Sequence, residues 1–198
     1  NSQILKPRLV ANYQGDNKSR AYLIMSYITG VSPGKVWHTI SDAQKEELIK
    51  RISQVLKAFQ SIDSSKLAFL GVKDPKNYIL SKGDKLTAKL LTKNIITSKK
   101  AEEVLAAISK MTQYFSENEV ARPVYWDIHF DNFIVDEGFK LKAIIDLENV
   151  RLLPLDYPLF VVRKQMELPH KYLAEEDEKY ADKKDCVHLW EWYKKYYP

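Results

Sequence analysis

The sequence lacks several features that mark particular protein classes. It has a single cysteine, Cys186, in 198 residues, so no disulfide can form within the chain and no Cys/His spacing of a zinc site exists. No apolar run reaches the roughly 18 residues that a membrane-spanning helix needs. The first residues, Asn1-Ser2-Gln3, have neither the basic nor the apolar region of a signal peptide. We therefore expect a protein of a reducing compartment, the cytoplasm, with no membrane partner.

The charge balance is only mildly basic. There are 31 Lys and Arg against 26 Asp and Glu, a formal net charge of +5, and the lysines are scattered along the chain. A nucleic-acid-binding surface would gather them in a stripe with aromatic residues between them, so no nucleic-acid partner is expected. Hydrophobic residues make up 45% of the chain, which predicts a globular protein with a sizeable core.

Residues 7–28 predict a β-hairpin. Residues 7–13 and 20–28 alternate in polarity as strands do, and the segment between them is rich in turn-forming residues. A helix should follow from Ser41 to Ile62, because Gln44 lies three positions after Ser41 in a capping-box arrangement. Its buried stripe is expected at helical spacing: Leu48, Ile52, Val55, Leu56, Phe59 and Ile62.

The middle of the chain is less regular. Residues 67–97 are ambiguous and suggest short helical pieces with a lysine-rich surface. A clear helix is predicted over residues 98–115, with an inward face made of Val104, Leu105, Ile108, Met111 and Phe115. Residues 154–198 should be mostly helical, with an acidic surface at 175–185 and a set of aromatic residues that packs on the domain: Trp190, Trp192, Tyr193, Tyr196 and Tyr197.

A second hairpin carries the residues with the clearest chemistry. The apolar runs 133–135 and 141–145 flank the turn Asp136-Glu137-Gly138. Asp127 and Asn132 lie on the loop before this hairpin, and Asp146 comes directly after it, so the hairpin should bring them together. Phosphoryl transfer needs a carboxylate to orient or deprotonate the attacking hydroxyl, and oxygen ligands for Mg²⁺.

Each of these residues alone has an ordinary structural interpretation. Asp127 and Asn132 are residue types common in turns, and Asp146 is suited to cap a following helix. Their joint spacing around the hairpin favours the functional interpretation, in which Asp127 is the base and Asn132 and Asp146 are metal ligands.

The same residues carry a family resemblance. Residues 126–136, WDIHFDNFIVD, resemble the H-G-D-L-H-x-x-N-I-L-V-D loop of aminoglycoside phosphotransferases and choline kinases, and residues 143–148, AIIDLE, resemble their I-I-D-W-E segment. The resemblance implies an α+β, protein-kinase-like fold, mainly its helical C-terminal lobe. It implies transfer from ATP or GTP to a small-molecule hydroxyl, with Asp127 as base and Mg²⁺ on Asn132 and Asp146. His129 matches the family's His, which orients the loop or has a structural role.

The first hairpin agrees with this resemblance. Residues 23–30, LIMSYITG, are similar to the family's last N-lobe strand and interlobe linker. The implied nucleotide contacts are the Ser26 carbonyl, the Ile28 amide and Met25 at the back of the adenine slot. Residues 1–30 would then be the end of an N-terminal lobe with its linker, and residues 31–198 the C-terminal lobe.

The sequence departs from the family in two ways. Tyr125 and Trp126 replace the His and Gly before the catalytic Asp, and the indole is expected to reshape or block the acceptor pocket. The six glycines form no phosphate-covering loop, and no strand-borne Lys with a partner Glu precedes Pro7. Three explanations stay open: a longer chain, which the missing initiator Met supports; a remnant that binds without transfer; or a partner chain that completes the site.

Two functions follow as hypotheses. The first is a Mg²⁺-dependent small-molecule kinase that uses ATP or GTP, with an alcohol group as acceptor. The alternative is a catalytically inactive, kinase-like binding module that lacks the phosphate-binding lobe. The acceptor itself has no readable signature in residues 67–97 or in the C-terminal segment.

Overall fold

The structure is a computed structural model that describes residues 4–16, 19–70, 74–113, 122–169 and 183–197. The chain divides into two compact units. Unit 1 contains Asn1–Phe59, Tyr125–Val150 and Asp156–Pro198, and unit 2 contains Gln60–Val124 and Arg151–Leu155. The predicted domain boundary at residue 30 stays a prediction.

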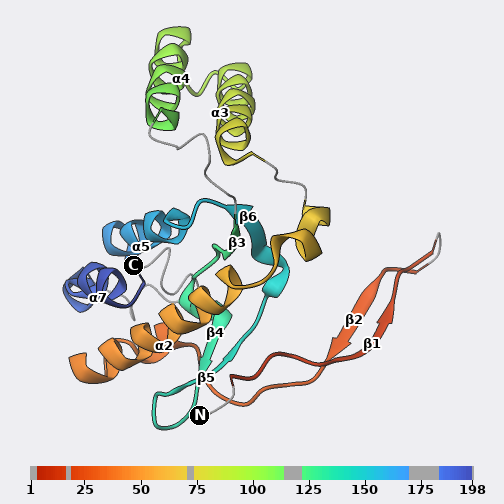
Figure 1. The fold of residues 1–198 in the computed structure, drawn as a ribbon, viewed down its shortest axis with the longest axis vertical. Coiled ribbons are helices and arrows are strands. Elements are labelled where there is room, and N and C mark those ends of the chain that lie inside the picture. Colours follow the sequence, from red (N-terminus) through yellow and green to blue (C-terminus); the bar gives the residue numbers. More distant parts are fainter. Residues whose placement is uncertain (1–3, 17–18, 71–73, 114–121, 170–182, 198) are drawn as a thin grey trace. The chain divides into compact units, whose positions relative to one another are not determined.

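Unit 1 begins with the predicted hairpin, drawn in red and orange in Figure 1. Strands β1 (Leu9–Tyr13) and β2 (Tyr22–Met25) pair antiparallel, with Tyr13 opposite Tyr22. The turn is held by Asp16, whose carboxylate accepts hydrogen bonds from the Tyr13 hydroxyl and the Ser19 amide, both at 2.8 Å. The predicted second strand is too long, because β2 ends at Met25.

Two helices follow the hairpin. The short α1 (Pro33–Val36) is capped by Ser32, and α2 runs from Asp42 to Gln60. The predicted capping box is confirmed: the Ser41 amide donates to Gln44 Oε1 at 3.0 Å, and the Gln44 amide donates to Ser41 Oγ at 3.4 Å. Four of the six predicted stripe residues, Leu48, Ile52, Val55 and Leu56, are buried in the core. Ile62 is wrong, because it lies beyond the end of α2 and is exposed.

The second predicted hairpin is also confirmed. Strands β4 (Phe133–Val135) and β5 (Leu141–Ile144) pair antiparallel (Figure 1). One further residue pairs with each outer edge of this two-stranded β4–β5 ribbon. At the β4 edge, Val31 and Val135 form two backbone hydrogen bonds with each other. At the β5 edge, the Leu5 amide donates to the Lys142 carbonyl, and the Leu5 carbonyl accepts from the Ile144 amide. The 3-10 turns η2 (Phe130–Asn132) and η3 (Leu147–Asn149) stand at the ends of the ribbon strands that carry the candidate residues.

The described residues of the C-terminal part of unit 1 are mainly helical, as predicted. Helix α5 (Tyr157–Glu167) and helix α7 (Leu189–Tyr196) both contribute buried side chains to the core. The 3-10 turn η5 (Lys183–Cys186) precedes α7. The aromatic end packs on the domain as expected, since Trp192, Tyr193 and Tyr197 are buried in the same core as α2 and the β4–β5 ribbon. The predicted acidic surface at 175–185 lies almost wholly outside the described residues.

Unit 2 is built around a helical hairpin, drawn in yellow and green in Figure 1. Helix α3 (Pro75–Thr92) follows the 3-10 turn η1 (Ser64–Leu70) and packs on α4 (Ser98–Thr112). Gly83 allows this approach, because a Cβ there would lie 2.6 Å from the Ile108 side chain. The short strands β3 (Arg122–Tyr125) and β6 (Val150–Leu153) pair with each other.

Two predictions for this region need correction. Within the segment 67–97, residues 75–92 form one continuous helix, α3, whose start is fixed by the Asp74 cap and Pro75. The prediction that Met111 points inward is wrong, because its side chain is 56% exposed. The buried residues of α4 are Ala101 and Thr112. Met111 is the neighbour of Thr112, and neighbouring residues of a helix point about 100° apart. The predicted Phe115 lies outside the described residues. No helix among those described is both long and apolar enough to cross a membrane.

Candidate active site

The loop that carries Asp127 is anchored by the residues on either side of it. Ile128 and Phe130 are fully buried, whereas Asp127 and His129 stay partly accessible. The buried Gln165 of α5 donates a hydrogen bond from Nε2 to the Ile128 carbonyl at 2.6 Å. Alternating burial therefore turns the Asp127 and His129 side chains away from the core while α5 holds the backbone between them.

Asn132 joins the loop to the segment that precedes Asp146. Its Nδ2 donates to the Asp127 carbonyl at 2.9 Å, and its own carbonyl accepts from the Ile145 amide at 2.9 Å. The structure thus brings Asp127, Asn132 and Asp146 to one end of the β4–β5 ribbon, as the sequence predicts. Because Nδ2 is engaged by the backbone, the carboxamide oxygen is the atom left to act as a ligand.

The Asp127 carboxylate is held by side chains. Asn149 Nδ2 donates to Oδ2 at 2.8 Å, and His129 Nε2 lies 3.8 Å from Oδ1. These contacts are not those of a turn or cap residue, which would accept from a nearby backbone amide. Asn149 thus holds Oδ2, and His129 lies beside Oδ1.

Asp146 has an unusual backbone conformation. Its φ is 55° and its ψ is 53°, in the left-handed region that few residues other than glycine, asparagine and aspartate adopt. It stands at the start of η3 but makes no side-chain cap hydrogen bond there, and it is exposed. The capping interpretation therefore has no support among the described contacts, and the carboxylate remains accessible as a ligand.

Tyr125 provides a further link between the two carboxylates. It is fully buried at the end of β3, and this burial, followed by the charges of Asp127 and Asp146, raises the pKa of its hydroxyl far above the usual range. The hydroxyl also donates a hydrogen bond to the Ile145 carbonyl at 3.2 Å, so Tyr125 contacts the residue directly before Asp146.

Trp126 is half-buried and packs against the core. Its indole lies edge-on to the Tyr157 ring, with centroids 6.4 Å apart and an interplanar angle of 89°. The side chain thus has a packing role at the beginning of α5. Its predicted effect on an acceptor pocket stays a prediction.

Sequence reasoning missed several residues around the loop. Asn149 holds the Asp127 carboxylate, Gln165 holds the loop backbone, and Ser32 Oγ donates to Asp131 Oδ1 at 2.7 Å, which ties the start of α1 to η2. Only Asn149 has a signal in the sequence, because it follows the Ile-Ile-Asp-Leu-Glu segment directly.

The three predicted nucleotide contacts lie together at the end of β2. The Ser26 amide donates to the Arg8 carbonyl at 2.9 Å, and Ser26 Oγ accepts from the Arg8 amide at 2.8 Å. Met25 is 55% exposed and Ile28 is half-buried. Within the described parts of the chain, no hydrogen bond or ion pair joins them to Asp127, Asn132 or Asp146, so their role stays a prediction.

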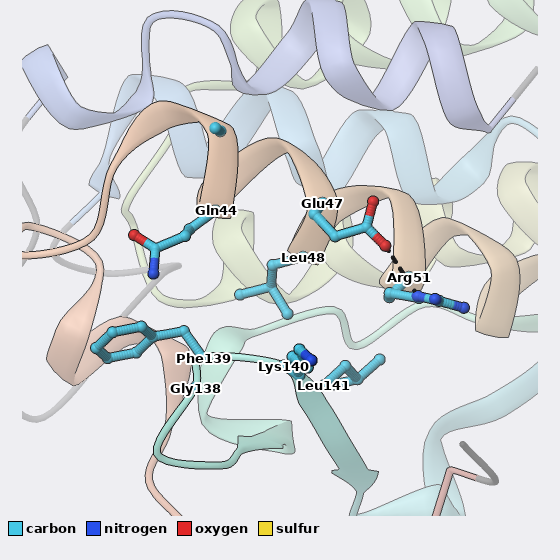
Figure 2. Close-up of a pocket in the computed structure, with 9 residues that line it drawn as sticks. Gln44, Glu47, Leu48, Arg51, Gly138, Phe139, Lys140 and Leu141 are labelled. Atoms are coloured by element: carbon cyan, nitrogen blue, oxygen red, sulfur yellow. Dashed lines mark hydrogen bonds and ion pairs between the residues drawn. The ribbon is translucent and has the colours of Figure 1, made fainter. Parts of the chain in front are cut away.

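A pocket of about 510 Å³ lies elsewhere, between α2 and the turn of the β4–β5 ribbon (Figure 2). Leu48 and Leu141 line it, and the Glu47–Arg51 ion pair stands on its α2 wall with a distance of 3.0 Å. The turn is at the opposite end of the ribbon from Asn132 and Asp146, so this pocket contains none of the candidate catalytic residues.

The candidate residues suit one kind of cation. Among the described residues, no group of three or more His, Cys, Asp or Glu side chains is placed to hold a metal. Mg²⁺ needs fewer protein ligands, because one or two carboxylates suffice when phosphate oxygens and water complete its coordination. The carboxamide oxygen of Asn132 and the carboxylate of Asp146 form a hard-oxygen donor set of that kind.

Solved structures of similar fold include aminoglycoside phosphotransferases. Aminoglycoside phosphotransferase APH(2'')-Ib bound to ADP is 20% identical, with a TM-score of 0.65 over 96% of this chain and 60% of its own. The APH(2'')-IIa–gentamicin complex has the same identity and TM-score over 98% and 60%. APH(3'')-Id from Streptomyces rimosus, with ADP and streptomycin, is 14% identical, with a TM-score of 0.60 over 98% and 70%.

The chain thus spans about 60% of the length of the first two of these proteins. A search of curated proteins gives no match. The model of the APH phosphotransferase enzyme family matches residues 2–196, nearly the whole chain. This chain therefore belongs to the APH phosphotransferase enzyme family, and it has the kinase-like fold of aminoglycoside phosphotransferases.

Proposed function

We propose that the chain carries the catalytic and metal-binding part of an ATP- or GTP-dependent phosphotransferase that acts on a hydroxyl group of a small molecule. The observation that carries the proposal is the meeting of Asp127, Asn132 and Asp146 at one end of the β4–β5 ribbon, through the hydrogen bonds of Asn132 to Asp127 and of Ile145 to Asn132. Membership in the phosphotransferase family supports it.

Asp127 is the base in this proposal. Its Oδ2 is occupied by Asn149, so Oδ1 is the oxygen that accepts a hydrogen bond from the acceptor hydroxyl. The hydroxyl oxygen forms the new bond to the γ-phosphorus, the bond to the β-phosphate oxygen breaks, and Asp127 takes the hydroxyl proton. His129, 3.8 Å from Oδ1, borders the position of the acceptor.

Asn132 and Asp146 are the proposed Mg²⁺ ligands. These two side chains would hold a Mg²⁺ ion, which would supply positive charge to offset the negative charge of the phosphate groups. The protein's contribution is to hold the two oxygen ligands, and the Asn132–Ile145 backbone hydrogen bond of 2.9 Å fixes the distance between their segments. ADP- and GDP-bound relatives of the same fold support a nucleotide as phosphoryl donor.

The proposal is tested by separating binding from transfer. Mg²⁺-dependent binding of ATP and GTP is measured by calorimetry, and hydrolysis or transfer by release of ADP or GDP. Asp127→Asn should retain nucleotide binding and lose at least about 100-fold in turnover, the usual scale of a general base. Asp146→Asn should weaken the Mg²⁺-dependent part of binding.

Glu137→Gln is the matched control, because it neutralises an exposed carboxylate at the other end of the same ribbon. It should behave as the wild type in both assays. A wild-type protein that binds neither nucleotide in the presence of Mg²⁺ would refute the proposal, as would an Asp127→Asn protein with full turnover.

A second candidate is the non-catalytic binding module, and the β1–β2 hairpin favours it. Leu9, Val10, Leu23 and Ile24 are each at least half exposed. A two-stranded sheet is only marginally stable by itself, and no layer covers this one in the described part of the chain. A partner chain that covers the hairpin would explain this exposure and would complete or replace a nucleotide site. This candidate predicts no turnover and an Asp127→Asn protein that keeps its partner.

A further inference from the structure

Tyr125 is a buried tyrosine with a fixed ring. It lies two residues before Asp127, in the place where the resemblance expects a His. Its ring stacks on Phe59 with centroids 5.6 Å apart and an interplanar angle of 21°, and it meets Phe133 edge-on at 6.3 Å and 85°. Contacts on two sides of the ring leave the hydroxyl group little freedom to move.

The hydroxyl group reaches the segment that carries Asp146. It donates a hydrogen bond to the Ile145 carbonyl at 3.2 Å. The Ile145 amide is already bound by the Asn132 carbonyl at 2.9 Å. Ile145 is therefore held at both of its backbone polar groups, and the next residue, Asp146, takes the left-handed conformation with φ of 55°.

The direction of this hydrogen bond follows from the two groups that make it. A carbonyl oxygen can only accept, so the Tyr125 hydroxyl is the donor to Ile145. Replacing Tyr125 by Phe would therefore leave the Ile145 carbonyl without this donor.

We infer that Tyr125 is a positioning residue: its hydroxyl fixes the Ile145–Asp146 peptide and so sets the Asp146 carboxylate relative to Asn132. This inference rests on the proposed function of Asp146 as a metal ligand. It assigns to Tyr125 an effect on Mg²⁺ use, which a tyrosine that only fills the core would not have.

The test removes the hydroxyl and keeps the ring. Tyr125→Phe should leave nucleotide affinity without Mg²⁺ unchanged and raise the Mg²⁺ concentration needed for half-maximal binding of a non-hydrolysable ATP or GTP analogue. The expected shift is about 3- to 10-fold, the effect of one lost hydrogen bond. Amide hydrogen exchange at Ile145 should become faster by a similar factor.

Tyr193→Phe is the matched control. Tyr193 is also fully buried, and its hydroxyl has no hydrogen-bond partner among the described residues. The same atom is lost in both variants, so a general effect of changing a buried tyrosine would appear in both. Only Tyr125→Phe should alter the Mg²⁺ dependence and the exchange at Ile145.

The outcomes separate the two proposals. A Tyr125→Phe protein with wild-type Mg²⁺ dependence overturns the positioning role and leaves the proposed function intact, whether or not exchange at Ile145 changes. A wild-type protein without Mg²⁺-dependent nucleotide binding overturns the proposed function, and the positioning role with it. A Mg²⁺ shift of equal size in Tyr193→Phe also overturns the role of Tyr125.

Discussion

Asn149 and Asp127 are joined by a side-chain hydrogen bond of 2.8 Å, from Nδ2 of the amide to Oδ2 of the carboxylate. The two residues are 22 positions apart, and η3 turns Asn149 back toward the loop after β3. The proposed base is therefore oriented by a residue that directly follows the proposed metal-binding segment, which couples the two parts of the site.

Loss of this hydrogen bond should reduce transfer more than binding. Asn149→Ala frees the Asp127 carboxylate to rotate, so we expect kcat to fall about 10-fold with KM nearly unchanged, as for an interaction that matters mainly in the transition state. Steady-state kinetics with the wild type as reference measures this.

An equivalent pair elsewhere provides the control for Asn149. Asn77 Nδ2 donates to Asp74 Oδ2 at 2.6 Å at the exposed start of α3. Asn77→Ala removes the same kind of contact and should leave kcat within about twofold of the wild type. Equal losses in the two variants, or a change confined to KM in Asn149→Ala, would contradict the orienting role.

The grouping of Asp127, Asn132 and Asp146 could be predicted from the sequence. Two apolar runs around a short turn define a hairpin, and a hairpin returns its end to its start. Their partners could not be predicted in the same way. Gln165 reaches Ile128 across 37 positions, and no local pattern specifies where α5 lies on the loop.

The helix α3 shows a different limit. Its apolar positions have no clear period, so pattern analysis of residues 67–97 yields only short pieces. Its first residues are nevertheless typical of a helix start. Asp74 is the N-cap and accepts a hydrogen bond from the Asn77 amide at 3.1 Å, and Pro75 occupies the first turn. Asp74 and Pro75 therefore indicate where this helix begins, which its hydrophobic spacing does not.

Gln165 should contribute to stability through the loop backbone. Gln165→Leu leaves the buried Ile128 carbonyl without its side-chain donor, and we expect the free energy of unfolding to fall by about 1–3 kcal/mol. Urea denaturation measures the change. Arg163→Gln, on the same helix, removes an exposed ion pair with Glu167 and should lower the free energy of unfolding by less than about 1 kcal/mol. Equal decreases in the two variants would argue against a role for the Ile128 contact.

Gly30 is required by both conformation and space. Its φ is 146°, and a Cβ at this position would lie 2.5 Å from the Val135 carbonyl oxygen and collide with the Ile134 side chain. Gly30→Ala should therefore separate the Val31 segment from β4 and lower the free energy of unfolding by about 2–4 kcal/mol.

Gly138 offers the matched control for this substitution. It has no positive φ, and the nearest atom to an added Cβ is Asp136 Oδ1 at 3.4 Å. Gly138→Ala should change the free energy of unfolding by no more than about 0.5 kcal/mol. Thermal or urea unfolding of the two variants measures the difference. A Gly30→Ala protein as stable as Gly138→Ala would show that the Gly30–Val31 segment does not depend on this approach to β4.

Glu46 should make stability depend on pH. Its Oε1 accepts hydrogen bonds from Lys195 Nζ and the Tyr196 hydroxyl, both at 2.8 Å, which joins α2 to α7. The bond from Lys195, then that from Tyr196, lowers the pKa of Glu46. Because the folded state has the lower pKa, the stabilisation is complete above the unfolded-state pKa of about 4.3 and is lost as the pH falls through the folded-state value.

Glu46→Gln isolates this contribution. The variant should be less stable than the wild type at pH 7, and the difference between their unfolding midpoints should shrink as the pH falls below about 4. Glu191→Gln is a control with an exposed carboxylate on α7, whose partner is His188 at 3.3 Å. Added salt should also reduce the Glu46 effect, because the group is accessible to solvent. A stability difference that stays constant from pH 7 to pH 3 would mean that Glu46 acts through packing and not through its charge.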